Sequence, residues 1–87
     1  MPLMATQLTI GDYNKWRQGF DSGKPMRAAA GISNERVFRN ADNPNEVLLV
    51  GEAADVQKVR AMLNSPELKA RMQQSGVVGP PKSYVME

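Results

Sequence analysis

The chain has 87 residues, with 11 Lys and Arg against 9 Asp and Glu, which gives a net charge of +2. It contains no Cys and no His, which excludes disulfides and removes the common ligands of zinc, copper and haem, so we predict no metal or other cofactor. We expect one domain, residues 1–87. Such a chain buries only about 60–65% of the surface that it exposes when unfolded, so we expect self-association to add cover.

The charge and hydropathy patterns argue against two classes of partner. The basic residues are scattered and form no stripe with aromatic residues, so we expect no nucleic-acid partner. No apolar stretch approaches the ~20 residues of a membrane helix, and the start, MPLMATQLTI, lacks the basic region and cleavage site of a secretion signal. We expect a cytoplasmic protein with no membrane partner.

The first strand is predicted at residues 4–10, MATQLTI, where two sets of residues alternate between the faces. Gln7 and Thr9 share one of these faces. A dry core does not favour polar side chains on a central strand. We therefore expect these two residues to be exposed, paired or lining a wet cavity.

The first helix is predicted to follow Asp12, whose carboxylate can accept hydrogen bonds from backbone N–H groups of the first turn. Tyr13, Trp16 and Phe20 follow at i, i+3 and i+7, which predicts an apolar stripe facing a sheet. The sequence DSGKP interrupts this helix, and MRAAAG is predicted to add a further helical turn.

The second strand, residues 32–40, is poorly patterned, because Ile32 and Phe38 would share a face with Asn34 and Arg36. Charged side chains at such positions suit a sheet edge, where they discourage unwanted pairing. The following ADNPNE is rich in turn-forming residues.

The last third of the chain contains clear helix signals. A second helical region is predicted to begin at Asp55 and to restart at Ser65, which precedes a proline at the first helical position. Gly76 is expected to end it. The Gly-Pro-Pro that follows cannot continue a helix, so residues 82–87 are predicted to form a closing strand.

The order β-α-β-β-α-β predicts an α+β, ferredoxin-like sandwich with a four-stranded antiparallel sheet of order 4-1-3-2. The third strand contains VLLV at residues 47–50. A half-solvated antiparallel strand should alternate apolar and polar residues, so both faces of this strand are expected to be covered. The helices can cover only one face, which predicts that a second copy of the chain covers the other.

Several stretches together resemble a known group: DYNKW, FD with Arg27 and Gly31 downstream, VFRNADNPNEV, SPEL and GVVGPP. They are similar to the small stand-alone members of the dimeric α+β barrel superfamily, relatives of the antibiotic biosynthesis monooxygenases that often carry cyclase-like labels. The resemblance covers about residues 8–87. It implies a homodimer with two sheets packed face to face, and a cavity between sheet and helices.

The chain departs from the pattern of that group at three places. Where relatives often carry His in the first strand, this chain has Leu8, and after the FD pair it has Ser22 and Gly23. Glu52 matches an acid that large aromatics often flank, and here its neighbours are small. The resemblance thus implies that the acid–base groups are lost and that the cavity is wider at the sheet wall.

The candidate residues each allow a structural and a functional interpretation. Trp16 either packs the first helix on the sheet or forms a stacking wall for a flat ligand. Glu52, if it points inward, is a carboxylate in a poorly solvated place that could accept a proton; if it points outward, it is a solvated strand end. Tyr84 either bonds a ligand oxygen or seals the dimer interface.

Arginine and methionine residues add further candidates. Arg27, Arg36 and Arg39 are expected to pair with Glu52 or Asp21, or to hold a ligand carboxylate. Four methionines either fill the core or line an adaptable apolar pocket: Met26, Met62, Met72 and Met86. The ligand-binding set predicted from the sequence is Gln7, Thr9, Trp16, Arg27, Phe38, Glu52, Met72 and Tyr84.

The sequence favours a homodimer that binds a small, largely apolar or aromatic molecule in a cavity between sheet and helices. The alternative is a cofactor-independent monooxygenase or a cyclase-like enzyme acting on an aromatic or polyketide-like substrate, which rests on analogy of fold alone. A third interpretation is an adaptor without a cavity. No nucleophile elbow, phosphate-binding glycine loop or paired-carboxylate signature is present.

Overall fold

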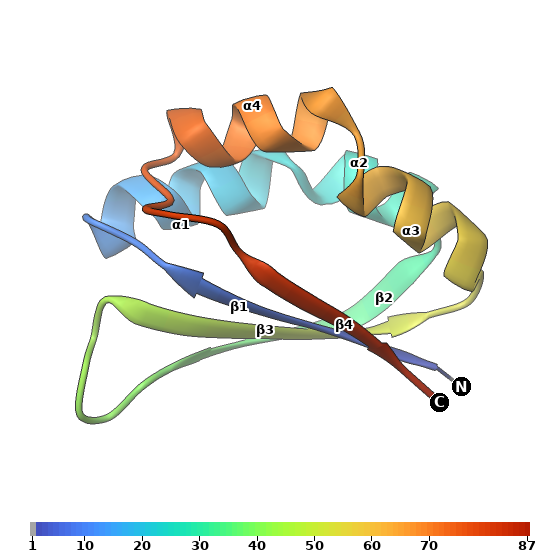
Figure 1. Ribbon diagram of the computed structural model, residues 1–87, viewed down its shortest axis with the longest axis horizontal. Helices are drawn as coiled ribbons and strands as arrows, with labels where there is room; N and C mark the ends of the chain where they lie inside the picture. The colour runs from blue at the N-terminus through green and yellow to red at the C-terminus, as the bar shows by residue number, and fades with distance from the viewer. Residues whose placement is uncertain (1) are drawn as a thin grey trace.

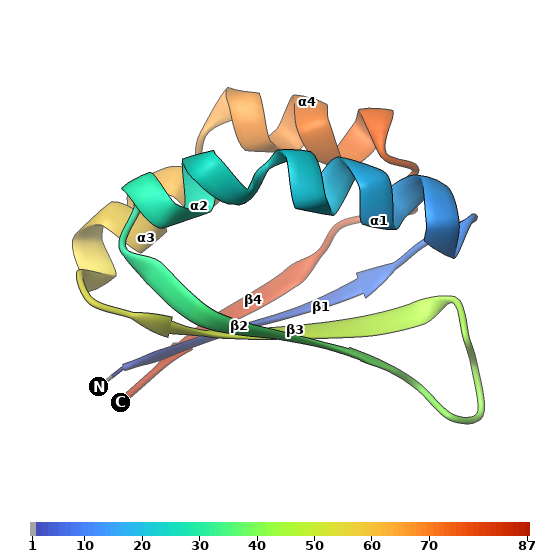
Figure 2. The ribbon, with the colours of Figure 1, turned by 180° about the vertical axis from the view of Figure 1, so that it is seen from behind.

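The computed structural model describes residues 2–87. Four strands and four helical segments form two layers, a sheet and the helices that cover one of its faces (Figures 1 and 2). In chain order the elements are β1 (Leu3–Thr9), α1 (Tyr13–Ser22), α2 (Lys24–Ala29), β2 (Ile32–Arg39), β3 (Glu46–Ala53), α3 (Val56–Leu63), α4 (Pro66–Gln74) and β4 (Lys82–Met86).

The sheet is antiparallel throughout, with the order β2-β3-β1-β4. Its two central strands pair over seven residues, from Leu3 opposite Glu52 to Thr9 opposite Glu46. Both helical regions consist of two pieces, α1 with α2 and α3 with α4. The predicted ferredoxin-like fold and strand order are therefore confirmed, and β4 forms an edge of the sheet as expected.

Polar side chains begin the helices where the sequence predicts them. The Asp12 carboxylate accepts hydrogen bonds from the backbone N–H groups of Asn14 and Lys15, at 2.9 and 3.3 Å. Asp55 caps α3 in the same way, and the Ser65 hydroxyl accepts from the N–H group of Leu68 at 3.2 Å. These bonds satisfy backbone donors that have no partner within the helix.

The core lies between the helices and the inner face of the sheet, in two clusters. One cluster comprises Met4, Ala30, Ile32, Ala53, Val59 and Met62. The other comprises Leu8, Ile10, Trp16, Val47 and Leu49. Trp16 packs α1 onto the sheet and is 2% exposed, so its predicted packing role is confirmed.

The pattern predicted for β2 is wrong in one respect. Ile32 is buried on the inner face, whereas Phe38 is exposed on the opposite face. The reason is an irregularity between Ser33 and Arg36, where β2 contains one more residue than the facing part of β3, and where Asn34 adopts a φ of 51°. The extra residue of such a bulge reverses the alternation of the side chains that follow it.

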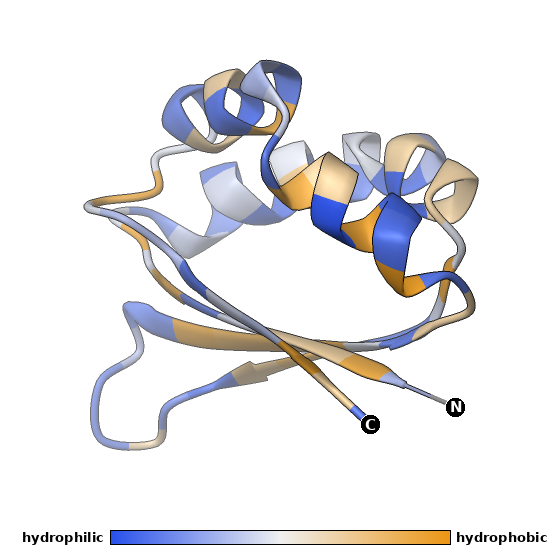
Figure 3. Ribbon diagram, turned by 45° about the vertical axis from the view of Figure 1, so that its right-hand side comes forward, coloured by the Kyte–Doolittle hydropathy of each residue, from blue (hydrophilic) through white to orange (hydrophobic). Residues whose placement is uncertain are grey.

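The outer face of the sheet, opposite the helices, carries a group of exposed apolar residues. Each is between 40% and 52% exposed, and the group comprises Leu3, Phe38, Leu48, Tyr84 and Met86. The ribbon coloured by hydropathy shows hydrophobic stretches along the strands that no helix covers from this side (Figure 3). Val47 and Leu49 lie under the helices, so β3 is apolar on both faces, as VLLV indicated.

No helix formed by residues 2–87 combines the length and the apolar character that crossing a membrane requires.

Candidate functional site

An inner cavity of about 70 Å³ lies between the helices and the sheet. Its walls are mostly apolar and include Trp16, Met62 and Met72, while Thr6 and Arg27 are among its few polar residues. Pockets that hold organic ligands usually measure about 300–1,000 Å³. The inner cavity is thus too small to enclose such a ligand as it stands.

The glycine beside Glu52 does not widen this cavity. A Cβ atom at Gly51 would lie 2.8 Å from Cγ2 of Ile32, which means that Ile32 already occupies the space that a larger side chain would fill. The expectation of a wider sheet wall at this position is therefore not met.

A larger groove of about 930 Å³ is lined by residues of α3, α4 and β4. Figure 1 shows these three elements, with α3 and α4 above the strand. We call this space the β4 groove. It is formed by the end of α3, by α4, by the segment after α4 and by β4. Its lining comprises Arg60, Leu63, Asn64, Leu68, Lys69, Met72, Gln73, Val77, Gly79, Pro80, Pro81, Ser83 and Val85.

The inner cavity and the β4 groove are separated by shared side chains. Leu63, Leu68 and Met72 line both spaces, and each of the three is only partly buried. Methionine is unbranched and adapts readily to irregular spaces. These three side chains therefore form the boundary at which the two spaces meet.

A pair of hydroxyl groups lies where β1 meets β4. Thr6 is 2% exposed, and its Oγ1 lies 3.0 Å from Oγ of Ser83. Thr6 lines the inner cavity and Ser83 lines the β4 groove. Since a hydroxyl both donates and accepts, this pair offers one hydrogen-bonding position on an otherwise apolar floor.

Aromatic rings form the wall of the inner cavity that α1 contributes. The centroids of Trp16 and Phe20 are 5.1 Å apart with their planes inclined at 26°, and Tyr13 lies 5.8 Å from Trp16. Offset stacking at such distances stabilises aromatic pairs. Trp16 therefore lies in the core and also lines the inner cavity. Its role as a stacking wall for a flat ligand stays a prediction.

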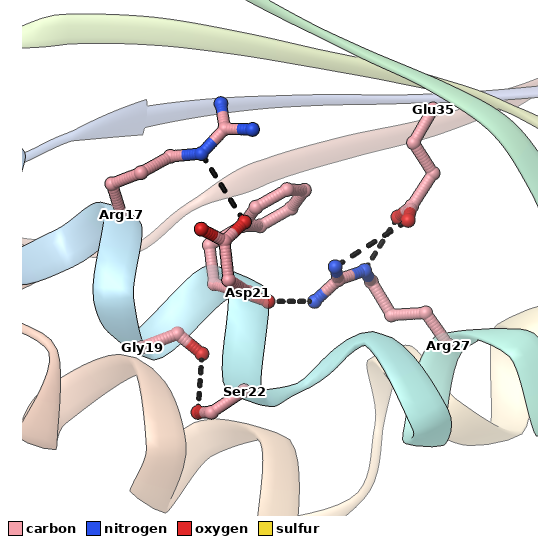
Figure 4. Close-up of polar contacts among 7 residues, drawn as sticks. Arg17, Gly19, Asp21, Ser22, Arg27 and Glu35 are labelled. Carbon is pink, nitrogen blue, oxygen red and sulfur yellow. Dashed lines mark hydrogen bonds and ion pairs between the residues drawn. The ribbon is translucent and has the colours of Figure 1, made fainter.

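Arg27 is held by three neighbouring groups (Figure 4). Its Nε and Nη2 donate to the two carboxylate oxygens of Glu35, at 2.5 and 3.4 Å. Nη1 donates to the backbone oxygen of Phe20 at 2.7 Å, and the guanidinium lies 3.8 Å from the centroid of the Phe20 ring. The partner predicted for Arg27 was Glu52 or Asp21; that prediction is wrong, because Asp21 pairs with Arg17 and Glu52 lies on the outer face.

Among residues 2–87, the two other candidate arginines form no ion pair with Glu52 or Asp21. Arg39 donates to the backbone oxygen of Pro44 at 3.2 Å, and its guanidinium lies 4.1 Å from the centroid of the Tyr13 ring. Arg36 is exposed and lies opposite Val50 on the neighbouring strand β3.

The predicted ligand-binding set divides between the two faces of the sheet. Trp16, Arg27 and Met72 come together around the inner cavity. The remaining five lie on the outer side: Gln7, Thr9, Phe38, Glu52 and Tyr84. The structure thus brings three of the eight together at the cavity.

Two of the outer residues have polar partners on neighbouring strands. Nε2 of Gln7 donates to Oε1 of Glu46 at 2.5 Å, so Gln7 is paired, which is one of the alternatives that its position allowed. Glu52 accepts a hydrogen bond from the side-chain amide of Asn34. Its outward direction removes it from the inner cavity and from the role of a proton acceptor there.

Sequence reasoning missed the residues that build the β4 groove. Leu63, Leu68, Val85 and the cations Arg60 and Lys69 come from three separate segments. The available signal was the apolar spacing on α3 and α4, since Leu63 and Leu68 fall at the two ends of the break between these helices. Neither residue type is distinctive without the fold that brings the segments together.

Carboxylates are absent from the walls of both spaces. Of residues 2–87, none that lines the inner cavity or the β4 groove is Asp, Glu or Tyr. The same residues include no group of three Asp or Glu that could hold a metal ion, and none of their buried side-chain polar atoms lacks a partner. The walls can hold an apolar body and a few hydrogen-bond acceptors, but they offer no general base.

Neither a protein-family model nor a curated protein matches the sequence. Solved structures do match. A proposed antibiotic biosynthesis monooxygenase from Bordetella bronchiseptica superposes with a TM-score of 0.79 over 99% of this chain and 94% of that one, at 13% identity. The chain shares the fold of the antibiotic biosynthesis monooxygenases. This agrees with the resemblance that the sequence motifs indicated.

Two further structures match over nearly the whole chain. SnoaB from Streptomyces nogalater, a cofactor-independent oxygenase, gives a TM-score of 0.73 at 13% identity, covering 99% of this chain and 92% of its own. A proposed antibiotic biosynthesis monooxygenase from Deinococcus radiodurans gives 0.68 at 15% identity, covering 100% and 91%. At these identities the likeness shows the fold and not the chemistry.

Proposed function

We propose that the protein is a homodimer that binds a small, largely apolar organic molecule in the inner cavity and the β4 groove. The observation that carries this proposal is that the two spaces adjoin at Leu63, Leu68 and Met72, which line both. A change of rotamer at the adaptable Met72 would join them. Together they offer a wall of apolar side chains without a carboxylate. Burial of apolar ligand surface against such a wall contributes a favourable free energy of about 25 cal/mol per Å² removed from water.

The homodimer is supported by the outer face of the sheet. Five large apolar side chains are exposed there, including Leu48 on the central strand β3 and Phe38 opposite it on the edge strand β2. Exposed apolar groups that adjoin one another mark surfaces for association. A second copy with its sheet packed on this one would bury them, at the distance of about 10 Å that separates stacked sheets.

Fluorescence of Trp16 tests ligand binding, because it is the only tryptophan and lines the inner cavity. We expect decan-1-ol to change the emission of Trp16 with saturation. In the Met72→Phe variant a rigid ring replaces the adaptable side chain, so the two spaces should remain separate. The affinity for decan-1-ol should fall by roughly tenfold, because overpacking costs about 1.4 kcal/mol of binding free energy.

The matched control is Val78→Phe, because Val78 is 59% exposed, lies outside the apolar group of the outer face and lines neither space. That variant should bind decan-1-ol as the unmodified protein does. The proposal is wrong if decan-1-ol leaves the emission of Trp16 unchanged up to its solubility limit, or if both variants bind equally well.

A second candidate function is a cofactor-independent monooxygenase or cyclase-like activity on an aromatic or polyketide-like substrate. The specific observation in its favour is the fold shared with SnoaB. The outward direction of Glu52 and the absence of carboxylates from both linings count against it. Oxygen uptake with a panel of quinols tests it: turnover that Met72→Phe abolishes and Val78→Phe retains would establish the enzyme in place of the binding protein.

A further inference from the structure

The β4 groove carries positive charge that no neighbouring group neutralises. Arg60 on α3 and Lys69 on α4 line it, and both are exposed. Among residues 2–87, no carboxylate lies within salt-bridge distance of either cation. The nearest acid along α4, Glu67, is paired with Arg71 at 3.7 Å and does not line the groove.

The groove has an apolar part and a charged part. Leu63, Leu68 and Met72 form the part that adjoins the inner cavity, whereas the two cations lie on the exposed surface of the same helices. A ligand whose apolar end reaches toward Met72 would therefore leave its other end near Arg60 and Lys69. Two cations without counter-charges favour an anion at that end.

We propose that the ligand of the β4 groove is an amphipathic organic carboxylate, with an apolar chain or ring system and one terminal anionic group. Its apolar part contacts Leu63, Leu68 and Met72, and its carboxylate lies between Arg60 and Lys69. This inference rests on the proposed function, since it names the class of molecule that the same site takes. The shared chemistry covers aliphatic and aromatic carboxylates alike.

Solvent exposure of the two cations limits the preference for a carboxylate. Both cations are solvent-exposed, and an exposed ion pair changes an equilibrium by a factor of about 2 to 5. Two such pairs together give a preference of roughly tenfold for a carboxylate over the corresponding alcohol. The preference should weaken as salt increases, because exposed charges are screened over about 10 Å at 0.1 M ionic strength.

Isothermal titration calorimetry with three ligands of equal chain length tests the inference: decanoate, decan-1-ol and decylammonium. We expect decanoate to bind about ten times more tightly than decan-1-ol, and decylammonium to bind more weakly than either, because the two cations repel it. The double variant Arg60→Ala, Lys69→Ala should lose the preference for decanoate and keep its affinity for decan-1-ol.

The control is a double variant with the same change in net charge, Lys24→Ala with Lys58→Ala. Both lysines are exposed on helices but do not line the groove. This control should retain the preference for decanoate. Because all four positions are exposed, we expect unchanged melting temperatures, and Arg60→Gln with Lys69→Gln repeats the test should the alanine variant be less stable.

The outcomes separate this inference from the proposed function. Equal affinities for decanoate and decan-1-ol would overturn the carboxylate assignment and leave the proposed function standing. Loss of the decanoate preference in the control as well as in the groove variant would overturn it too, since net charge alone would then explain it. If no ligand of the three binds, both the inference and the proposed function are wrong.

Discussion

Replacing Arg27 with Met should destabilise the protein more than any substitution on its surface, because Arg27 joins three elements. Its guanidinium connects Glu35 on β2 with the backbone oxygen of Phe20 on α1, and it projects from α2. The side chains of Arg27 and Glu35 are only 10% and 17% exposed. Removal of Arg27 thus leaves the Glu35 carboxylate poorly solvated and without its partner.

The expected magnitude follows from this burial. Breaking one partner of a buried ion pair costs about 3–5 kcal/mol, and the lost contact with the Phe20 ring adds about 0.5–1 kcal/mol. In a domain of 60–100 residues, 1 kcal/mol shifts the melting temperature by about 4–8 °C. The Arg27→Met variant should therefore melt at least about 12 °C below the unmodified protein.

Urea unfolding followed by Trp16 fluorescence, at one fixed protein concentration, measures the change in the free energy of unfolding. The double variant Arg27→Met, Glu35→Leu is the control, because replacing both charges with apolar groups removes the unpaired carboxylate. It should recover at least half of the lost stability. A loss below 1 kcal/mol for Arg27→Met, or a double variant less stable than the single one, would refute the reasoning.

Three further predictions concern helix contacts and the outer face. Gly19→Ala would place a Cβ atom 2.7 Å from Cβ of Ser75. Thermal unfolding should show a net loss of about 1–2 kcal/mol in the free energy of unfolding, despite the better helix propensity of Ala, and adding Ser75→Gly should relieve it. Unaltered stability in both variants would contradict the close contact. Asp55→Ala should lower stability by about 1 kcal/mol, since the N–H groups of Gln57 and Lys58 lose their acceptor; circular dichroism during urea titration measures it, and an unchanged midpoint would show that the cap contributes nothing. Leu48→Glu should convert the proposed homodimer to a folded monomer in analytical ultracentrifugation, whereas Lys58→Glu on the exposed surface of α3 should not. A Leu48→Glu variant that stays dimeric would place the interface elsewhere.

The elements were predictable because their signals are local. Asp12, Asp55 and Ser65 each offer an oxygen at the residue before a helix, and each accepts the backbone hydrogen bonds that this position requires. The apolar run at residues 47–50 indicated a strand that needs cover on both faces, and Leu48 and Leu49 do face opposite sides. Order and type of the elements then leave few sheet topologies.

The site was less predictable because it depends on facts that are not local. The bulge at residues 33–36 reverses the faces of β2. Asn tolerates positive φ better than most residues, but the chain has six Asn residues and their type alone does not single out Asn34. Five of the eight candidate residues were polar or aromatic residues on strands, and they face away from the helices. The walls of the β4 groove consist mainly of ordinary apolar residues that only the packing of α3 and α4 against β4 brings together.

Methionine methyl groups offer the most direct test of the central claim, that an apolar molecule enters between the helices and the sheet. The chain has six methionines; Met72 lines both spaces, Met62 lines the inner cavity, and Met86 is on the outer face. In ¹³C-methyl-methionine NMR, addition of decan-1-ol should shift the signals of Met72 and Met62 and leave that of Met86 in place. A shift confined to Met86, with Met72 and Met62 unmoved, would contradict the account.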